Sequence, residues 1–348
     1  MTVTAPLDER EKTILACVVR THVETALPVA SERVVRDTGL AFSSATIRTL
    51  MNRMEDRGLL SQPHTSSGRI PTDRGYRVYV DDIMDSASPG REEQEAVFSG
   101  LDRVAPRPDR LPSSVSGLVG RLSGHLGFAS PPRLDEGIFG GLFADRVAGG
   151  RIAWMLTLHS GLIRTSVAVP PEPVDDESFD RDVAALGARF RGLPVREVRE
   201  LVFGERGERT MASTPVVRAF RAAAAELLET WRGGGVTVFG FEALAAQPEF
   251  RNPNDLAALG EFLRERGTLR GELEPQRAGG GPEVRIGGEN DRDELKPCSV
   301  VVTRYRFGHF TGVMGVIGPT RMNYDRTTGL IDFVRRVVET RMGDIPEA

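Results

Sequence analysis

The feature that most constrains the fold is an apolar stripe on a predicted helix that runs from Ser43 or Ser44 to Gly58. Serine at such a position caps the first helical turn, and glycine readily ends a helix. Between these residues, apolar side chains recur at the i, i+3, i+4, i+7 spacing of one helical face. The stripe consists of Ile47, Leu50, Met51 and Met54. A helix of this kind draws most of its stability from the neighbours that cover its stripe.

Two helical segments precede this helix. Asp8 and Glu11 stand at the spacing of a capping box, which predicts a helix start. The segment from Ser31 to Gly39 begins with a capping residue and ends with the residue most tolerant of a left-handed turn. Helix, turn and helix are therefore predicted before the third helix begins.

A hairpin is predicted directly after the third helix. Residues 59–63 and 70–71 are short strand fragments, and they flank the polar tip 64–69 with its single arginine. Thr72 follows as the cap of a further helix. Such a tip by itself also suits a plain hairpin, but the order of three helices, hairpin and helix is typical of a winged helix-turn-helix. We therefore predict this fold, and binding of double-stranded DNA, for residues 7–80.

The polar face of the third helix carries side chains that suit base reading. Arg donates two hydrogen bonds to guanine, Asn pairs with adenine, and Thr packs on the thymine methyl group. The face presents Ala45, Arg48, Thr49 and Asn52, with Thr46 and Arg53 on its flanks. We predict base contacts by Arg48, Thr49 and Asn52, and phosphate contacts by Ser44, Thr46, Arg53, His64, Thr65 and Arg69. A plain solvated face is the alternative for an isolated helix.

Composition limits the other partners. The net charge is −4, but residues 1–80 carry 11 basic and 9 acidic side chains, which leaves −6 for the remainder. Basic residues therefore gather where DNA contact is predicted. The apolar runs are far shorter than a membrane span and the N-terminus has no secretory pattern, so a membrane partner and export are not expected. Cys17 and Cys298 have no metal-ligand or redox spacing, which fits a reducing cytoplasm and predicts no metal.

Beyond residue 85 the patterns predict an α+β multidomain protein. Residues 86–114, rich in Pro, Ser, Gly and charge, indicate a linker with a short helix around 92–97. Predicted strands cover 152–158, 162–169, 283–286, 298–305 and 310–317. Glycine-rich breaks at 233–235 and 279–281 lie between the early and late strands. Strands before and after a mostly helical interval predict one sheet domain interrupted by an inserted unit.

At these residues the sequence resembles HrcA, the bacterial heat-inducible transcription repressor family. The resemblance rests on residues 43–48 (Ser-Ser-Ala-Thr-Ile-Arg), Glu55, 63–77 (Pro-His-Thr-Ser-Ser-Gly-Arg-Ile-Pro-Thr-Asp-Arg-Gly-Tyr-Arg), 247–251 (Gln-Pro-Glu-Phe-Arg), 286–290 (Ile-Gly-Gly-Glu-Asn) and 315–324 (Gly-Val-Ile-Gly-Pro-Thr-Arg-Met-Asn-Tyr). It runs from about Leu7 to the C-terminal helix and is weakest between Gly204 and Gly235. The family usually has Asn where this chain has Thr49, so the operator preference is expected to differ.

The resemblance implies a domain order and a function. It implies a winged helix-turn-helix (1–85), a linker (86–114), a GAF-like domain in two parts (115–203 and 281–348) and an inserted dimerising domain (204–280). The expected function is repression of chaperone operons by a homodimer on an inverted-repeat operator of the CIRCE type. GroEL is the implied chaperonin partner, and heat stress is expected to relieve repression.

No enzyme is predicted, and no cofactor. The glycines of 313–318 lack the Gly-Lys-Ser/Thr ending of a phosphate loop, and Ser160-Gly161 lacks the preceding glycine of a nucleophile elbow. The run Asp175-Asp176-Glu177 is better explained as a solvated helix start than as a metal site. The alternative function is a winged-helix regulator whose GAF-like domain senses a small molecule, which only fold analogy supports.

Overall fold

The computed structural model describes residues 6–64, 67–102, 110–132, 136–204, 213–229, 235–277, 280–307 and 310–342. Thr65, residues 103–109 of the predicted linker and parts of both glycine-rich breaks lie outside these ranges. The chain forms two compact units. Unit 1 comprises Met1–Ala129, Val236–Arg304 and Val313–Val337, and unit 2 comprises Ser130–Gly235, Tyr305–Gly312 and Val338–Ala348.

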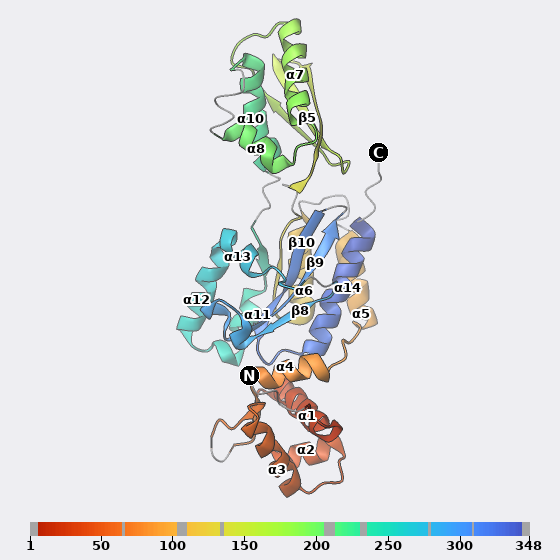
Figure 1. The fold of residues 1–348 in the computed structure, drawn as a ribbon, viewed down its shortest axis with the longest axis vertical. Helices are drawn as coiled ribbons and strands as arrows, with labels where there is room; N and C mark the ends of the chain where they lie inside the picture. Colours follow the sequence, from red (N-terminus) through yellow and green to blue (C-terminus); the bar gives the residue numbers. More distant parts are fainter. Residues whose placement is uncertain are drawn as a thin grey trace. The chain divides into compact units, whose positions relative to one another are not determined.

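The N-terminal part of unit 1 contains the predicted helices and hairpin (Figure 1). Its elements are α1 (Glu9–Thr25), α2 (Ser31–Thr38), α3 (Ser44–Asp56), β1 (Leu60–Ser61), β2 (Ile70–Pro71) and α4 (Asp73–Asp82). Asp8 and Glu11 form the predicted capping box, and Gly39 ends α2 with a φ of 63°. The stripe residues Ile47, Met51 and Met54 are buried against the neighbouring helices.

The base of the hairpin is held by a backbone bridge. Val29, between α1 and α2, pairs antiparallel with Arg69 through two hydrogen bonds of 2.8 and 2.9 Å. Gly68 allows this close approach, because a Cβ atom there would lie 2.3 Å from the carbonyl oxygen of Val29. The position of Arg69 beside α3 follows from this bridge.

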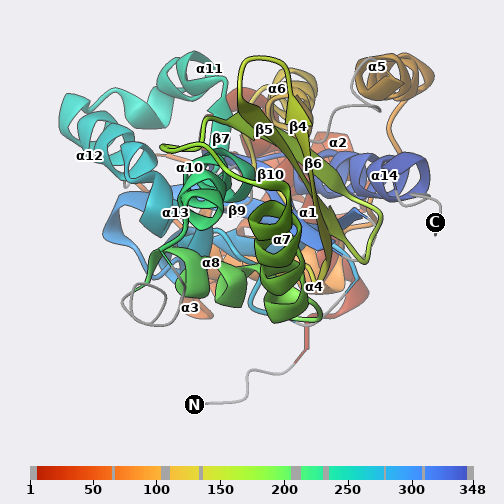
Figure 2. The ribbon, with the colours of Figure 1, turned by 90° about the horizontal axis from the view of Figure 1, so that it is seen from above.

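The rest of unit 1 is built around a five-stranded sheet in the order β7-β3-β10-β9-β8, of which residues 305–307 and 310–312 belong to unit 2. The strands are β3 (Leu126–Ala129), β7 (Thr237–Phe239), β8 (Glu283–Ile286), β9 (Cys298–Phe307) and β10 (Phe310–Pro319). The short helices around it are α11 (Phe241–Ala245), η3 (Pro248–Phe250), α12 (Pro253–Arg264), α13 (Arg266–Glu272), η4 (Gly287–Glu289) and η5 (Asp293–Leu295). Figures 1 and 2 show α12 on one face of the sheet and α14 (Tyr324–Met342) on the other.

The short helix predicted around residues 92–97 of the linker is confirmed, but it is longer and covers residues 91–102. These residues form α5 (Arg91–Asp102), which packs on α6 (Leu111–Ser123) and buries Val97 and Leu101. Phe98 meets Phe333 of α14 edge to face, with 5.6 Å between the ring centroids. The Pro, Ser and charged residues of this segment are typical of a linker. The helix packs nevertheless, because Val97, Phe98 and Leu101 lie at helical spacing and face its neighbours.

Unit 2 contains a separate three-stranded sheet, β4-β5-β6. Its elements are β4 (Phe139–Val147), β5 (Arg151–Leu158), β6 (Ile163–Ala168), α7 (Asp176–Phe190), α8 (Val195–Phe203) and α10 (Pro215–Glu229). Trp154 packs edge to face on Phe220 and Phe139 on Phe190, so the helices cover one face of the sheet.

The prediction that the early and late strands share one sheet is therefore wrong, because among the described strands β4, β5 and β6 form a sheet of their own. The interruption of the larger sheet begins after β3, at Ser130, and ends at Gly235. The resemblance to the family implies an insertion at 204–280 instead. The alternation along β5 indicates a strand with one buried face, but it carries no information about which sheet the strand joins.

No described helix combines the length and apolar character needed to cross a bilayer. Among the described residues, His, Cys, Asp and Glu side chains form no group of three that would hold a metal ion. Asp175 caps α7, as expected, by accepting a 2.8 Å hydrogen bond from the amide of Ser178.

Candidate nucleic-acid interface

Helix α3 presents the predicted polar face to solvent. Thr46, Arg48, Thr49, Asn52 and Arg53 are exposed, whereas in the opposite stripe three residues are buried and Leu50 is half-buried. The amphipathic spacing therefore correctly separated the covered side of this helix from its open side.

Two arginines on this face are available to a ligand. In the part of the chain that the structure describes, the guanidinium groups of Arg48 and Arg53 have no hydrogen-bond or ion-pair partner. The hydroxyl of Thr49 donates a 3.1 Å hydrogen bond to the carbonyl of Ala45, one turn back. Arg48 and Arg53 thus keep all their donors for a partner outside the chain.

The N-terminus of α3 has a polar network of its own. Ser43 caps the helix by accepting a 3.1 Å hydrogen bond from the amide of Thr46. The hydroxyl of Ser44 donates to Glu32 at 2.9 Å and lies 3.0 Å from the hydroxyl of Ser31. A hydrogen bond from its own backbone amide, followed by the one from Ser44, lowers the pKa of Glu32. Sequence reasoning placed Ser44 at a phosphate, and the structure adds a carboxylate beside it.

Arg69, which was predicted to contact a phosphate, is largely covered by its neighbours. Its side chain is only 13% exposed. Its Nη2 atom donates to Asn52 Oδ1 at 2.8 Å and lies 2.8 Å from Glu55 Oε2. The only arginine of the predicted tip therefore turns towards α3, because the bridge at Val29 holds its backbone there.

A groove separates α3 from the hairpin. Its volume is about 470 Å³, and its wall includes Arg48, Asn52, Gln62 and Arg69, together with Glu32. Ser67 stabilises the turn at its edge, where the amide of His64 donates to the Ser67 hydroxyl at 3.0 Å. His64 is exposed, as its predicted phosphate contact requires.

Two acidic residues at this surface were not predicted as part of it. Glu55 contacts Arg69, and Glu32 contacts Ser44. The i, i+3 spacing of Asn52 and Glu55 on one helix was a usable signal, because residues so spaced are neighbours on the helix surface. Glu32 lies on another helix, and its contact depends on tertiary packing alone.

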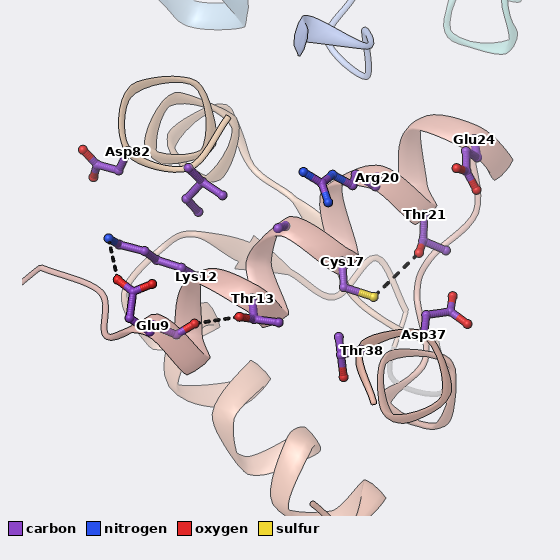
Figure 3. A pocket seen from close by; sticks show the side chains of 12 residues that line it. Glu9, Lys12, Thr13, Cys17, Arg20, Thr21, Glu24, Asp37, Thr38 and Asp82 are labelled. Atoms are coloured by element: carbon purple, nitrogen blue, oxygen red, sulfur yellow. Dashed lines mark hydrogen bonds and ion pairs between the residues drawn. The ribbon is translucent and has the colours of Figure 1, made fainter. Parts of the chain in front are cut away.

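A second pocket lies on α1, α2 and α4 (Figure 3). Its volume is about 560 Å³, and Cys17 at its wall lies 4.0 Å from the hydroxyl of Thr21. The charged residues that line it are Glu9, Lys12, Arg20, Glu24, Asp37 and Asp82. With four carboxylates against two cations, this pocket does not suit a nucleic-acid phosphate.

Comparisons with known proteins agree on one family. The model described as "HrcA protein C terminal domain" matches residues 109–328. The protein named "Heat-inducible transcription repressor HrcA" from Desulforudis audaxviator (strain MP104C) is 31% identical over 333 residues, which covers 95% of this chain and 96% of that protein. The protein of the same name from Herpetosiphon aurantiacus is 30% identical and covers 97% and 96% of the two chains.

A solved structure supports the fold. The crystal structure of a hypothetical protein covers 97% of this chain and 98% of its own, with a TM-score of 0.61 and 22% identity. Together with the family match across most of the chain, this leads to one conclusion. The chain belongs to the HrcA family of heat-inducible transcription repressors.

Proposed function

We propose that this chain is a transcriptional repressor of heat-shock chaperone operons that binds an inverted-repeat operator of the CIRCE type. The relatives carry the name of heat-inducible transcription repressors. The observation that carries the proposal is the exposed face of α3, where Arg48 and Arg53 keep their donors free among the described residues. In a winged helix-turn-helix, the helix in this position enters the major groove.

The contacts are divided between bases and backbone. Base reading is assigned to Arg48, Thr49 and Asn52, and phosphate contact to Ser44, Thr46, Arg53, His64 and Thr65. The free amides at the capped start of α3 also favour an anionic oxygen. Arg69 lies within reach of the same groove, but its bonds to Asn52 and Glu55 give it a different part, which is argued below.

The proposed homodimer uses the open face of the β4-β5-β6 sheet. Phe143, Ile163 and Val167 are 53, 54 and 51% exposed, and the strand register places them on one face together with Met155. The other face is covered by α7 and α10. An apolar sheet face of this kind is typical of a protein contact, and a two-fold dimer matches a two-fold operator.

Regulation is proposed from the family alone. GroEL assists the repressor in reaching its active form, and stress-denatured proteins that occupy GroEL lower the amount of active repressor. The layout implied by the family is a winged helix-turn-helix followed by a GAF-like domain, to which we assign the five-stranded sheet, with a dimerising insertion. Because the target is chromosomal DNA, the site of action is the cytoplasm.

A gel-shift titration tests the proposal. The full chain is titrated against a duplex with a CIRCE-type inverted repeat and against a scrambled duplex of equal length, at one fixed salt concentration, because affinity for DNA depends steeply on salt. We expect at least a thousandfold preference for the inverted repeat, the lower end for specific binders. Equal affinity for the two duplexes would contradict operator recognition.

A further inference from the structure

The backbone of Arg69 has little freedom. The bridge to Val29 holds it on one side through both of its hydrogen-bonding groups. Gly68 next to it leaves no space for a shift, since even a Cβ atom would meet the Val29 carbonyl at 2.3 Å. The side chain of Arg69 therefore starts from a defined point opposite α3.

The guanidinium of Arg69 joins two residues of α3. A single nitrogen, Nη2, donates to Asn52 Oδ1 and faces Glu55 Oε2, each at 2.8 Å. Its side chain is 13% exposed and that of Glu55 34%, so the ion pair is largely shielded from water. Shielding strengthens the attraction between the two charges, and Glu55 thus helps to hold Arg69 beside Asn52.

This contact determines how the amide of Asn52 is turned. A guanidinium group only donates, so the Asn52 atom that faces it has to be the oxygen. The amide nitrogen Nδ2, with two hydrogens, then points away from Arg69 on an exposed residue that lines the groove. Without Arg69, rotation about the terminal bond would exchange donor and acceptor at little cost.

We propose that Arg69 is a positioning residue for base recognition, and that the relay of Glu55, Arg69 and Asn52 presents a hydrogen-bond donor to the major groove. This inference rests on the DNA-binding function proposed above. Purines offer the acceptor N7 in that groove and thymine offers O4, whereas cytosine offers only its N4 amino donor. At the base position that Asn52 contacts, the outward donor therefore favours adenine, guanine or thymine over cytosine.

The test is a selection from duplexes with randomised half-sites, with the full chain at one salt concentration. Asn52→Ala and Arg69→Ala are expected to reduce discrimination against cytosine roughly tenfold at the same base position. The double variant should lose no more discrimination against cytosine than either single variant, because both substitutions act through the amide of Asn52. Arg53→Ala is the matched control: it removes the same charge from the same surface and should leave every base preference intact.

Asn52→Asp gives a second readout that does not depend on the fold of the Arg69 variant. The aspartate keeps an oxygen towards Arg69 and replaces the outward donor with an acceptor, so the preference should move towards cytosine. Melting curves of each variant confirm that it is folded. The inference is overturned if Arg69→Ala weakens all duplexes equally, as Arg53→Ala does, or if Asn52→Asp keeps the original preference. If the unaltered chain enriches no duplex, DNA recognition itself fails and the relay with it.

Discussion

Arg77 Nε donates a 2.8 Å hydrogen bond to Glu289 Oε1, although the two residues stand 212 positions apart in the chain. Arg77 lies on α4, which follows the hairpin, and Glu289 ends η4 next to β8. The same guanidinium donates to the carbonyl of Val284, and Asp73 accepts a 2.9 Å hydrogen bond from the amide of Gly288. Within unit 1, α4 is thus tied to the edge of the five-stranded sheet.

Arg77→Ala is expected to lower the free energy of unfolding by about 1–2 kcal/mol, because it breaks a charge-assisted pair whose two members are partly shielded. Urea unfolding followed by circular dichroism measures the loss. Arg91→Ala is the control, since Arg91 pairs with Glu95 on an exposed turn of α5 and its side chain is 91% exposed. Equal losses in the two variants would show that the contact of α4 with the sheet edge adds nothing to stability.

Stability is expected to fall in mild acid because of His125. Burial, followed by the charges of Arg321 and Arg326, lowers the pKa of His125 from 6.5 to about 4. Between these two pKa values the imidazole is protonated in the unfolded chain but not in the folded chain. The contribution of neutral His125 to the free energy of unfolding is therefore complete above pH 6.5 and is lost as the pH falls towards 4. The slope is at most about 1.4 kcal/mol per pH unit. Urea unfolding at pH 7.5, 6 and 5 should show a shallower decline for His125→Gln than for the unaltered chain, and parallel declines would rule His125 out as the cause.

Arg48→Ala is expected to reduce operator affinity by roughly 1–3 kcal/mol and to blunt discrimination against a scrambled duplex, because it removes a donor pair from a base. Arg53→Ala should weaken both duplexes alike and reduce the salt slope by about 1, as the loss of one phosphate contact requires. Gel-shift titrations at several salt concentrations separate the two effects. If Arg48→Ala weakens binding to both duplexes equally, Arg48 contacts the DNA backbone and not a base.

Phe143→Asp is expected to convert the proposed homodimer into monomers, because it places a charge in the middle of the apolar sheet face. Sedimentation velocity at several protein concentrations reports the change, and operator affinity should fall with it. Arg196→Gln, on the exposed side of α8, changes the charge by the same amount as a control and should leave the dimer intact. A dimer that survives Phe143→Asp would place the interface elsewhere.

Local signals predicted the N-terminal elements well. The expected caps are present at Asp8 and Glu11, at Ser43 before α3 and at Gly39 after α2, and each depends only on the few residues around it. The cap predicted at Ser31 is wrong, because the N-cap of α2 is Ala30 and no side chain bonds there. The apolar stripe of α3 was equally local, and its polar face is the exposed one.

Features that depend on distant residues were predicted less well. Neither strand β4 nor the buried strand β3 was predicted. A fully apolar four-residue segment gives no periodicity that separates a strand from a helix. The turn of Arg69 towards Glu55 and Asn52 likewise depends on the bridge at Val29, 40 positions earlier in the chain, which no pattern around Arg69 reveals.

The position of β3 in its sheet has a consequence for synthesis on the ribosome. This buried strand lies between β7 and β10, and Phe310 at the start of β10 is translated 181 residues after Ala129. At 5–20 residues per second, about 10–40 s pass between the emergence of the strand and that of its second neighbour. During this interval a nascent chain exposes the unpaired backbone edge of the strand and its apolar side chains, and both favour aggregation. A chaperone cavity that encloses the newly made chain would protect β3 from aggregation until β10 is available to pair with it. This protection would be useful at any temperature.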